Sequence, residues 1–254
     1  MPKLKNIPFQ FKNEVVNDKT VLTLSGVVRK PFSWENWDET INEKLVESVL
    51  FGVDGDIHIR LNSPGGDVFE GISICNFLKS LDNHVTIEVT ALAASAASII
   101  AMGADKVIMA KGANMMVHEA ITMEEGNKQV FRKAVNALET IDKSLVSIYQ
   151  AKTGLDEKTI TEFLVSETWF TAQEAVKKGF ADEIGNFESE KETGKDSGDS
   201  IEINDNGIKI ISNSINLDGM VKQITAKVKE QLKEEQQEPK PQNNLLKNFL
   251  GGIN

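Results

Sequence analysis

The chain has 254 residues, of which 40% are hydrophobic and 26% are charged. This length suffices for one sizeable α/β domain with an appended segment, and the composition is ordinary for a globular protein. The formal net charge of −10, without a dominant cluster of Lys and Arg, argues against a nucleic-acid partner. The longest apolar run, residues 91–104, is too short and too rich in alanine to span a bilayer, so we expect no membrane partner.

The single cysteine, Cys75, excludes an internal disulfide and a cysteine-based zinc cluster. It lies among apolar neighbours in a predicted helix, so we expect a buried structural thiol. The N-terminus has no signal-peptide pattern. We therefore expect a cytoplasmic protein that needs no cofactor and no metal.

The first 55 residues predict a strand or hairpin followed by a helix. Apolar residues alternate with polar ones between 15 and 24, which is typical of β-structure. A helical pattern follows over residues 35–50, with Ser33 as a candidate N-cap and glycines just after its end.

The next segment predicts alternating strands and helices. The strands are expected at 57–61, 85–90, 106–109 and 114–118, and the helices at 67–81 and 95–102. Asp67 predicts the N-cap of the first of these helices, and Glu70 would complete a capping box. Just before it, Pro64 and Gly65 match the second and third positions of a type II turn. This alternation predicts a mainly parallel sheet with crossover helices.

A long amphipathic helix is predicted over residues 127–152. Its apolar residues recur at helical spacing, and Gly154 provides a stop. Shorter helices follow, capped by Asp156 and Thr171, and we expect the globular domain to close near Gly185.

The composition changes in the last quarter of the chain. Residues 186–200 are charged and almost free of apolar side chains, which predicts an acidic flexible linker. Beyond it, Asn206-Gly207 predicts a hairpin, and residues 217–232 predict a helix whose narrow apolar seam suits a partner helix. We therefore expect a domain at 1–185, then the linker, then a partly disordered tail at 201–254.

Three stretches supply the parts of a serine hydrolase. Gly65-Gly66 offers backbone amides at a tight turn, Ser95 begins a predicted helix, and His118 ends a strand of the same parallel framework. A serine hydroxyl needs a base to remove its proton, and histidine is the best base near neutral pH. Ser95 is thus the candidate nucleophile and His118 the candidate base. The amides of Gly66 and Ala96 are the candidate oxyanion hole.

Other residues fit these roles less well. His84 lies in a polar turn, where a solvated side chain is expected, and His58 shares a strand face with Arg60, which suggests an exposed polar row. Ser98, one turn beyond Ser95, lacks the free amides and the positive dipole end of the helix start. Taken singly, each of the three stretches has a plain structural explanation, as a turn, a packing face or a strand residue.

Four motifs in this order resemble the Clp protease proteolytic subunit family of serine peptidases. They are Asn62-Ser63-Pro64-Gly65-Gly66, Ala93-Ala94-Ser95, Met115-Met116-Val117-His118, and Phe170-Thr171-Ala172-Gln173-Glu174-Ala175 followed by Gly179-Phe180-Ala181-Asp182. The resemblance covers roughly residues 15–185. It implies an α/β fold of the ClpP/crotonase-like type, a spiral of ββα units with a mainly parallel sheet, here with a C-terminal extension.

The resemblance also implies roles for individual residues. It matches Ser95 to the nucleophile, His118 to the general base, and Gly66 and Ala96 to the oxyanion-hole amides. The third triad member falls on Glu167, where the ATPase-partnered members usually carry aspartate. The long helix implies a ring-shaped homo-oligomer, with heptamers as the family habit, that acts on protein or peptide substrates.

Within the family, the chain looks most like phage and prophage members that act as prohead (head maturation) proteases. The stretches 93–102 and 167–172 carry this likeness, and the interval of 23 residues from Ser95 to His118 agrees with it. It implies capsid or scaffold proteins as substrates.

Three other interpretations stay open. The first is a housekeeping peptidase that works with a Clp-type ATPase, since the chain itself has no P-loop motif with which to hydrolyse ATP. The second is an inactive assembly module in which the tail does the work. The third is the related crotonase fold acting on acyl-CoA thioesters, where Ser95 and His118 would have no evident purpose.

Overall fold

The computed structural model describes residues 7–16, 19–30, 40–185, 200–204 and 207–211. The chain divides into two compact units, Met1–Gly198 and Asp199–Asn254. Among the described helices, none is long and apolar enough to cross a membrane.

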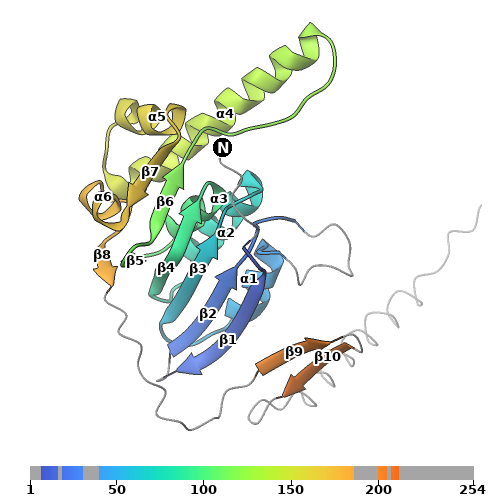
Figure 1. The fold of residues 1–254 in the computed structure, drawn as a ribbon, viewed down its shortest axis with the longest axis vertical. Coiled ribbons are helices and arrows are strands. Elements are labelled where there is room, and N and C mark those ends of the chain that lie inside the picture. Colours follow the sequence, from blue (N-terminus) through green and yellow to red (C-terminus); the bar gives the residue numbers. More distant parts are fainter. Residues whose placement is uncertain (1–6, 17–18, 31–39, 186–199, 205–206, 212–254) are drawn as a thin grey trace, which may run out of the picture. The chain divides into compact units, whose positions relative to one another are not determined.

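The first unit is built on a mixed sheet with eight strands among the described residues (Figure 1). The strands are β1 (Gln10–Val16), β2 (Lys19–Ser25), β3 (Ile57–Ser63), β4 (Val85–Ala94), β5 (Lys106–Ala110), β6 (Asn114–Val117), β7 (Thr168–Thr171) and β8 (Glu183–Gly185). The helices are α1 (Glu43–Leu50), α2 (Val68–Ser80), α3 (Ala96–Ala101), α4 (Lys128–Thr153), α5 (Glu157–Val165) and α6 (Ala172–Lys177).

The sheet order is β1-β2-β3-β4-β5-β8, and β6 pairs with both β4 and β7. Only the β1–β2 and β6–β7 pairs are antiparallel, so the prediction of a mainly parallel sheet is confirmed. The buried residues of β3, such as Ile59, alternate with more exposed ones, such as Arg60. The buried face packs beneath α2 and α3 and forms the core.

Strand β4 pairs with two neighbours in succession along one edge. Its residues Thr86–Val89 pair with β5, and Leu92–Ala94 pair with β6. The sheet therefore forks at the carboxyl end of β4, immediately before Ser95. That fork brings β6, and the residue after it, beside the start of α3.

Two predictions about the starts of helices are wrong, one for α1 and one for α2. Helix α1 begins at Glu43 and not at residue 35, because the Asn42 side chain accepts a hydrogen bond from the Leu45 amide and caps it there. The proposed cap, Ser33, lies outside the described residues. Glu70 does not complete a capping box with Asp67; its carboxylate accepts a hydrogen bond from the Glu43 amide at 3.0 Å and so ties α2 to α1.

The remaining helix starts agree with the sequence pattern. Asp67 accepts from the second and third amides of α2, Asp156 caps α5, and Thr171 caps α6 in a capping box with Glu174. The short strands β7 and β8 were not predicted, because three or four residues carry too little alternation to be recognised.

Helix α4 is the longest of the described elements, with 26 residues between the N-cap Asn127 and the left-handed C-cap Gly154. Its fully buried residues, Leu145, Val146 and Tyr149, all lie in the C-terminal half. The N-terminal half extends away from the sheet (Figure 1). The predicted helix over 127–152 is confirmed.

The described part of the second unit is a hairpin. Strands β9 (Ser200–Asn204) and β10 (Gly207–Ile211) pair antiparallel, as the Asn206-Gly207 pattern predicts. Asn206 itself, most of the predicted linker and the predicted helix at 217–232 lie outside the described residues.

Gly71 allows α2 to approach α3 closely. A Cβ atom there would lie 2.9 Å from the Ala96 carbonyl oxygen and 3.1 Å from the Ala96 Cβ. Replacing glycine by alanine in a helix interior normally stabilises a protein by about 1 kcal/mol. We expect Gly71→Ala to destabilise this fold by about 1–3 kcal/mol instead, because α2 must move away from α3.

The measurement is the melting temperature by circular dichroism. The matched control is Asn76→Ala, an exposed position on the same helix, which should leave the melting temperature unchanged or raise it. A Gly71→Ala protein that melts at or above the wild-type temperature would contradict the tight α2–α3 contact.

Candidate active site

Ser95 lies at the sharp turn between β4 and α3. Its backbone adopts φ 55° and ψ −124°, a region that L-residues rarely occupy and that costs about 1–3 kcal/mol. The Ser95 amide donates to the Met116 carbonyl of β6 at 2.9 Å, and its own carbonyl accepts from the Ser98 amide at 2.9 Å. A strained strand-to-helix turn of this kind holds a serine hydroxyl out toward a substrate.

His118 follows β6 directly and faces Ser95. Strands β4 and β6 are parallel, and Ala94 is opposite Met116. Ser95 follows β4 and His118 follows β6, so the two residues lie at the same edge of the sheet. The distance from His118 Nε2 to Ser95 Oγ is 2.7 Å. This is the reach that a general base needs to take a hydroxyl proton.

The environment of His118 keeps its imidazole neutral. Burial lowers its pKa from the ordinary value of 6.5, and this effect exceeds the opposing influences of the Glu167 charge, the Glu119 backbone and the Asp142 charge. A histidine with a lowered pKa is deprotonated at neutral pH, so His118 Nε2 can accept a hydrogen bond from the Ser95 hydroxyl.

Glu167 lies in the turn between α5 and β7, with a positive φ of 46°. In the antiparallel β6–β7 pair, Val117 is opposite Thr168. The next position beyond each strand therefore places His118 opposite Glu167. No hydrogen bond joins these two side chains in the part of the chain that the structure describes. The carboxylate instead acts on the imidazole through its charge, which raises the His118 pKa.

The amides of Gly66 and Ala96 both lie at the turns beside Ser95. Among the described residues neither N–H donates a hydrogen bond, so both can receive an oxyanion. The positive φ of Gly65, 85°, agrees with the predicted turn. Residue 66 has a positive φ of 149°, and a Cβ there would meet the Val28 carbonyl, so the turn requires glycine at this position.

A cleft of about 600 Å³ opens at Ser95 and His118. Gly65 and Gly66 form part of its wall. Much of its apolar lining comes from the start of α2, from α3 and from α4, and includes Val68, Phe69, Ile99, Leu138, Ile141 and Leu145. The wall of the cleft beside Ser95 and His118 is therefore largely apolar.

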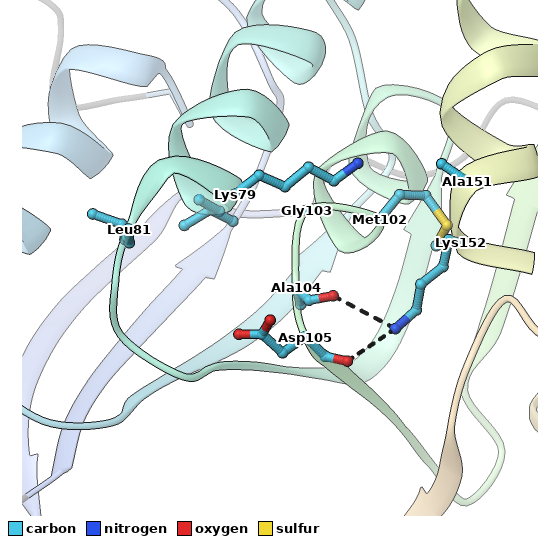
Figure 2. Close-up of a pocket in the computed structure, with 9 residues that line it drawn as sticks. Lys79, Leu81, Met102, Gly103, Ala104, Asp105, Ala151 and Lys152 are labelled. Atoms are coloured by element: carbon cyan, nitrogen blue, oxygen red, sulfur yellow. Dashed lines mark hydrogen bonds between the residues drawn. The ribbon is translucent and has the colours of Figure 1, made fainter.

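A second cavity, of about 280 Å³, is lined by the end of α2, the α3–β5 connection and the end of α4, and shares no residue with the cleft. Figure 2 shows Lys152 in its wall, donating to the carbonyls of Ala104 and Asp105. Lys152 also pairs with Asp182 at 3.0 Å. Lys152 therefore connects the end of α4 to the residues just before β5 and β8, which is a structural role.

The other residues considered from the sequence lie away from the cleft. His58 Nε2 lies 3.0 Å from the buried carboxylate of Glu88, so this histidine is polar, as predicted, but paired with an acid. His84 is exposed, and its Nδ1 atom lies 3.6 Å from the Asp105 carboxylate. Cys75 is buried, and burial raises the pKa of its thiol, as expected for a structural cysteine.

Two polar residues of α4 near the site were missed from the sequence. Asp142 Oδ1 accepts from the Ala120 amide at 2.8 Å, and the Tyr149 hydroxyl lies 2.8 Å from Ser98 Oγ. Tyr149 is four residues after Leu145 and so shares its helix face, which was the available signal. In the described part of the chain, no group of three or more His, Cys, Asp and Glu residues is placed to hold a metal ion.

A hydroxyl on a strained turn, an imidazole within hydrogen-bond reach and two free amides are the arrangement that serine hydrolases use. Comparison of the sequence with known families places the chain more narrowly. The sequence model of the Clp protease family matches residues 27–188, which is more than half of the chain, and the chain belongs to this family. The fold described above is the family's α/β fold.

Curated relatives agree with this placement. The chain is 31% identical over 137 residues to ATP-dependent Clp protease proteolytic subunit 1 of Protochlamydia amoebophila, covering 52% of this chain and 66% of the relative. It is 31% identical over 133 residues to the proteolytic subunit of Streptococcus mutans, covering 51% and 68%. It is 25% identical over 152 residues to subunit 2 of Tropheryma whipplei, covering 58% and 84%. The matches thus span about two thirds of the first two relatives.

The pH dependence of peptide cleavage should report the His118 environment. Only neutral His118 can accept the Ser95 proton, so kcat/KM should rise with pH through a midpoint below 6.5, the direction set by burial. Since the Glu167 charge raises the His118 pKa, Glu167→Gln should move the midpoint further down. It should also lower kcat by about 10–100-fold, since the imidazolium formed during reaction loses its counter-charge.

The measurement is kcat/KM of a fluorogenic peptide between pH 4.5 and 8. Glu162→Gln, an exposed carboxylate on α5, serves as the control and should leave the profile unchanged. A Glu167→Gln midpoint equal to that of the wild type would show that Glu167 does not act on His118.

Proposed function

We propose that the protein is a serine endopeptidase of the Clp type in which Ser95 is the nucleophile and His118 the general base. The observation that carries this proposal is the 2.7 Å contact between Ser95 Oγ and His118 Nε2 at a strained turn. The same contact argues against an inactive assembly module and against the crotonase-type alternative, because neither gives the pair a use.

The proposed cycle has two halves. Ser95 Oγ attacks a peptide carbonyl carbon while its proton passes to His118 Nε2, and the amides of Gly66 and Ala96 bind the resulting oxyanion. The C–N bond breaks, His118 gives the proton to the leaving amine, and an acyl-enzyme ester remains. His118 Nε2 then takes a proton from a water molecule as its oxygen attacks the ester carbonyl. The bond between the acyl carbon and Ser95 Oγ breaks, His118 returns the proton to Ser95 Oγ, and the carboxylic acid product leaves. Glu167 stabilises the charged imidazole in both halves.

We further propose that the active form is a homo-oligomer. The N-terminal half of α4 has exposed apolar side chains, with Phe131 48% and Val135 51% exposed, and Ile121 in the neighbouring loop is 70% exposed. Exposed apolar residues on the half of a helix that extends away from the sheet are suited to contact a second copy of the chain.

The finer proposal is a prohead protease that trims capsid or scaffold proteins. It rests on the stretches 93–102 and 167–172 and on the segments beyond a catalytic domain at 1–185. The linker at 186–200 and the tail at 201–254 would serve as a docking element for the assembling particle. The alternative is a housekeeping peptidase fed by a Clp-type ATPase.

Labelling with a fluorophosphonate tests the nucleophile. The wild type should be labelled on Ser95 and should cleave peptides with an apolar residue before the scissile bond. Ser95→Ala should lose labelling and at least about 10³-fold in kcat. Ser98→Ala keeps the nucleophile and should still be labelled. Label that survives in Ser95→Ala would overturn the assignment.

Co-expression tests the biological role. The prohead role predicts capsid and scaffold genes beside this gene. The wild type, expressed with their products, should yield discrete shortened products that Ser95→Ala does not yield. Complete degradation of unrelated proteins, seen only when a Clp-type ATPase and ATP are added, would support the housekeeping alternative and contradict the prohead role.

A further inference from the structure

Helix α4 reaches the catalytic region through two polar side chains that the mechanism above does not use. Asp142 and Tyr149 are seven residues apart, which places them two turns apart on one face of the helix. Each makes a hydrogen bond to the immediate surroundings of one member of the Ser95–His118 pair.

Asp142 holds the backbone that follows His118. Its Oδ1 atom accepts from the Ala120 amide at 2.8 Å, and the Glu119 amide donates to the Leu164 carbonyl of α5 at 3.2 Å. The two residues after the base are therefore fixed from two different helices. The Asp142 bond is the charge-assisted one, so it is the stronger of the two anchors.

Tyr149 holds the turn of the nucleophile through Ser98. Its ring is fully buried, and its hydroxyl is 2.8 Å from Ser98 Oγ. Ser98 Oγ donates its only proton to the Ser95 carbonyl at 2.7 Å, so Tyr149 must be the donor to Ser98. Burial raises the pKa of Tyr149, which keeps this donor protonated. The chain of two hydroxyls thus ends on the backbone carbonyl of the strained residue.

We propose that Asp142 and Tyr149 are positioning residues, through which α4 sets the approach of His118 to Ser95. This inference rests on the proposed peptidase function and adds to it the residues that hold its geometry. Neither side chain needs to touch substrate for this role.

The test is the second-order rate constant for phosphonylation of Ser95 by a small fluorophosphonate, which needs the Ser95–His118 pair but not the substrate cleft. Asp142→Ala should lower this rate by about tenfold, the effect of losing one charge-assisted hydrogen bond. Asp142→Asn should recover most of it, because an amide oxygen still accepts from Ala120.

Tyr149→Phe should lower the rate by about fivefold, as expected for loss of one neutral hydrogen bond. Ser98→Ala should have a similar or larger effect. The Tyr149→Phe, Ser98→Ala double variant should be no slower than Ser98→Ala, because both hydroxyls act through one chain. For all variants, kcat for a peptide should fall with the labelling rate.

Two exposed residues of α4 provide matched controls. Glu139→Gln removes a carboxylate charge and Ser144→Ala removes a hydroxyl, and both should be labelled at the wild-type rate. Melting temperatures identify variants that fail to fold, and Asp142→Asn and Tyr149→Phe then decide because they preserve size.

The outcomes separate the two levels of the proposal. Folded Asp142→Ala and Tyr149→Phe proteins labelled at the wild-type rate would overturn the positioning role alone. An Asp142→Asn protein that is labelled as slowly as Asp142→Ala would overturn the positioning role of Asp142. It would show that the charge of Asp142 acts on His118 instead. A wild-type chain that takes no label would instead overturn the proposed function.

Discussion

The left-handed backbone of Ser95 is the constraint on which the rest of the site depends. A residue in this conformation reverts to an ordinary one unless its neighbours hold it. The Ser95 amide donates a hydrogen bond to the Met116 carbonyl of β6, and the Ser95 carbonyl accepts one from the Ser98 amide in the first turn of α3. Strand β6 holds Ser95 and also leads directly into His118, so one element sets both the strain at Ser95 and the distance between Ser95 Oγ and His118 Nε2.

The fork in the sheet makes this arrangement possible. If β5 had continued along the whole of β4, the position beside Ala94 would be filled by a strand that carries no histidine. Because β5 ends early, β6 takes over the edge and in turn pairs with β7. The register of that last pair then brings Glu167 alongside His118. The registers of the β4–β6 and β6–β7 pairs thus place Ser95, His118 and Glu167 together, although they are distant in sequence.

Much of this could be predicted from the sequence, and the failures have physical reasons. Local signals, such as Pro64-Gly65 in a turn, Asp67 at a helix start and the long apolar stripe of α4, were sufficient because the determining contacts are within a few residues. Glu70 was misjudged because its partner, Glu43, is 27 residues away. Tyr149 and Asp142 were missed for the same reason, since their partners are 51 and 22 residues distant.

The buried position of Cys75 has a practical consequence. A thiol reacts as its thiolate, and this one is both enclosed and held protonated by its surroundings. It lies in α2, and its carbonyl faces Gly103 at the close of α3, so it cannot be reached while these two helices stay together. As the only cysteine of the chain, it makes the rate of thiol modification a measure of the separation of α2 from α3.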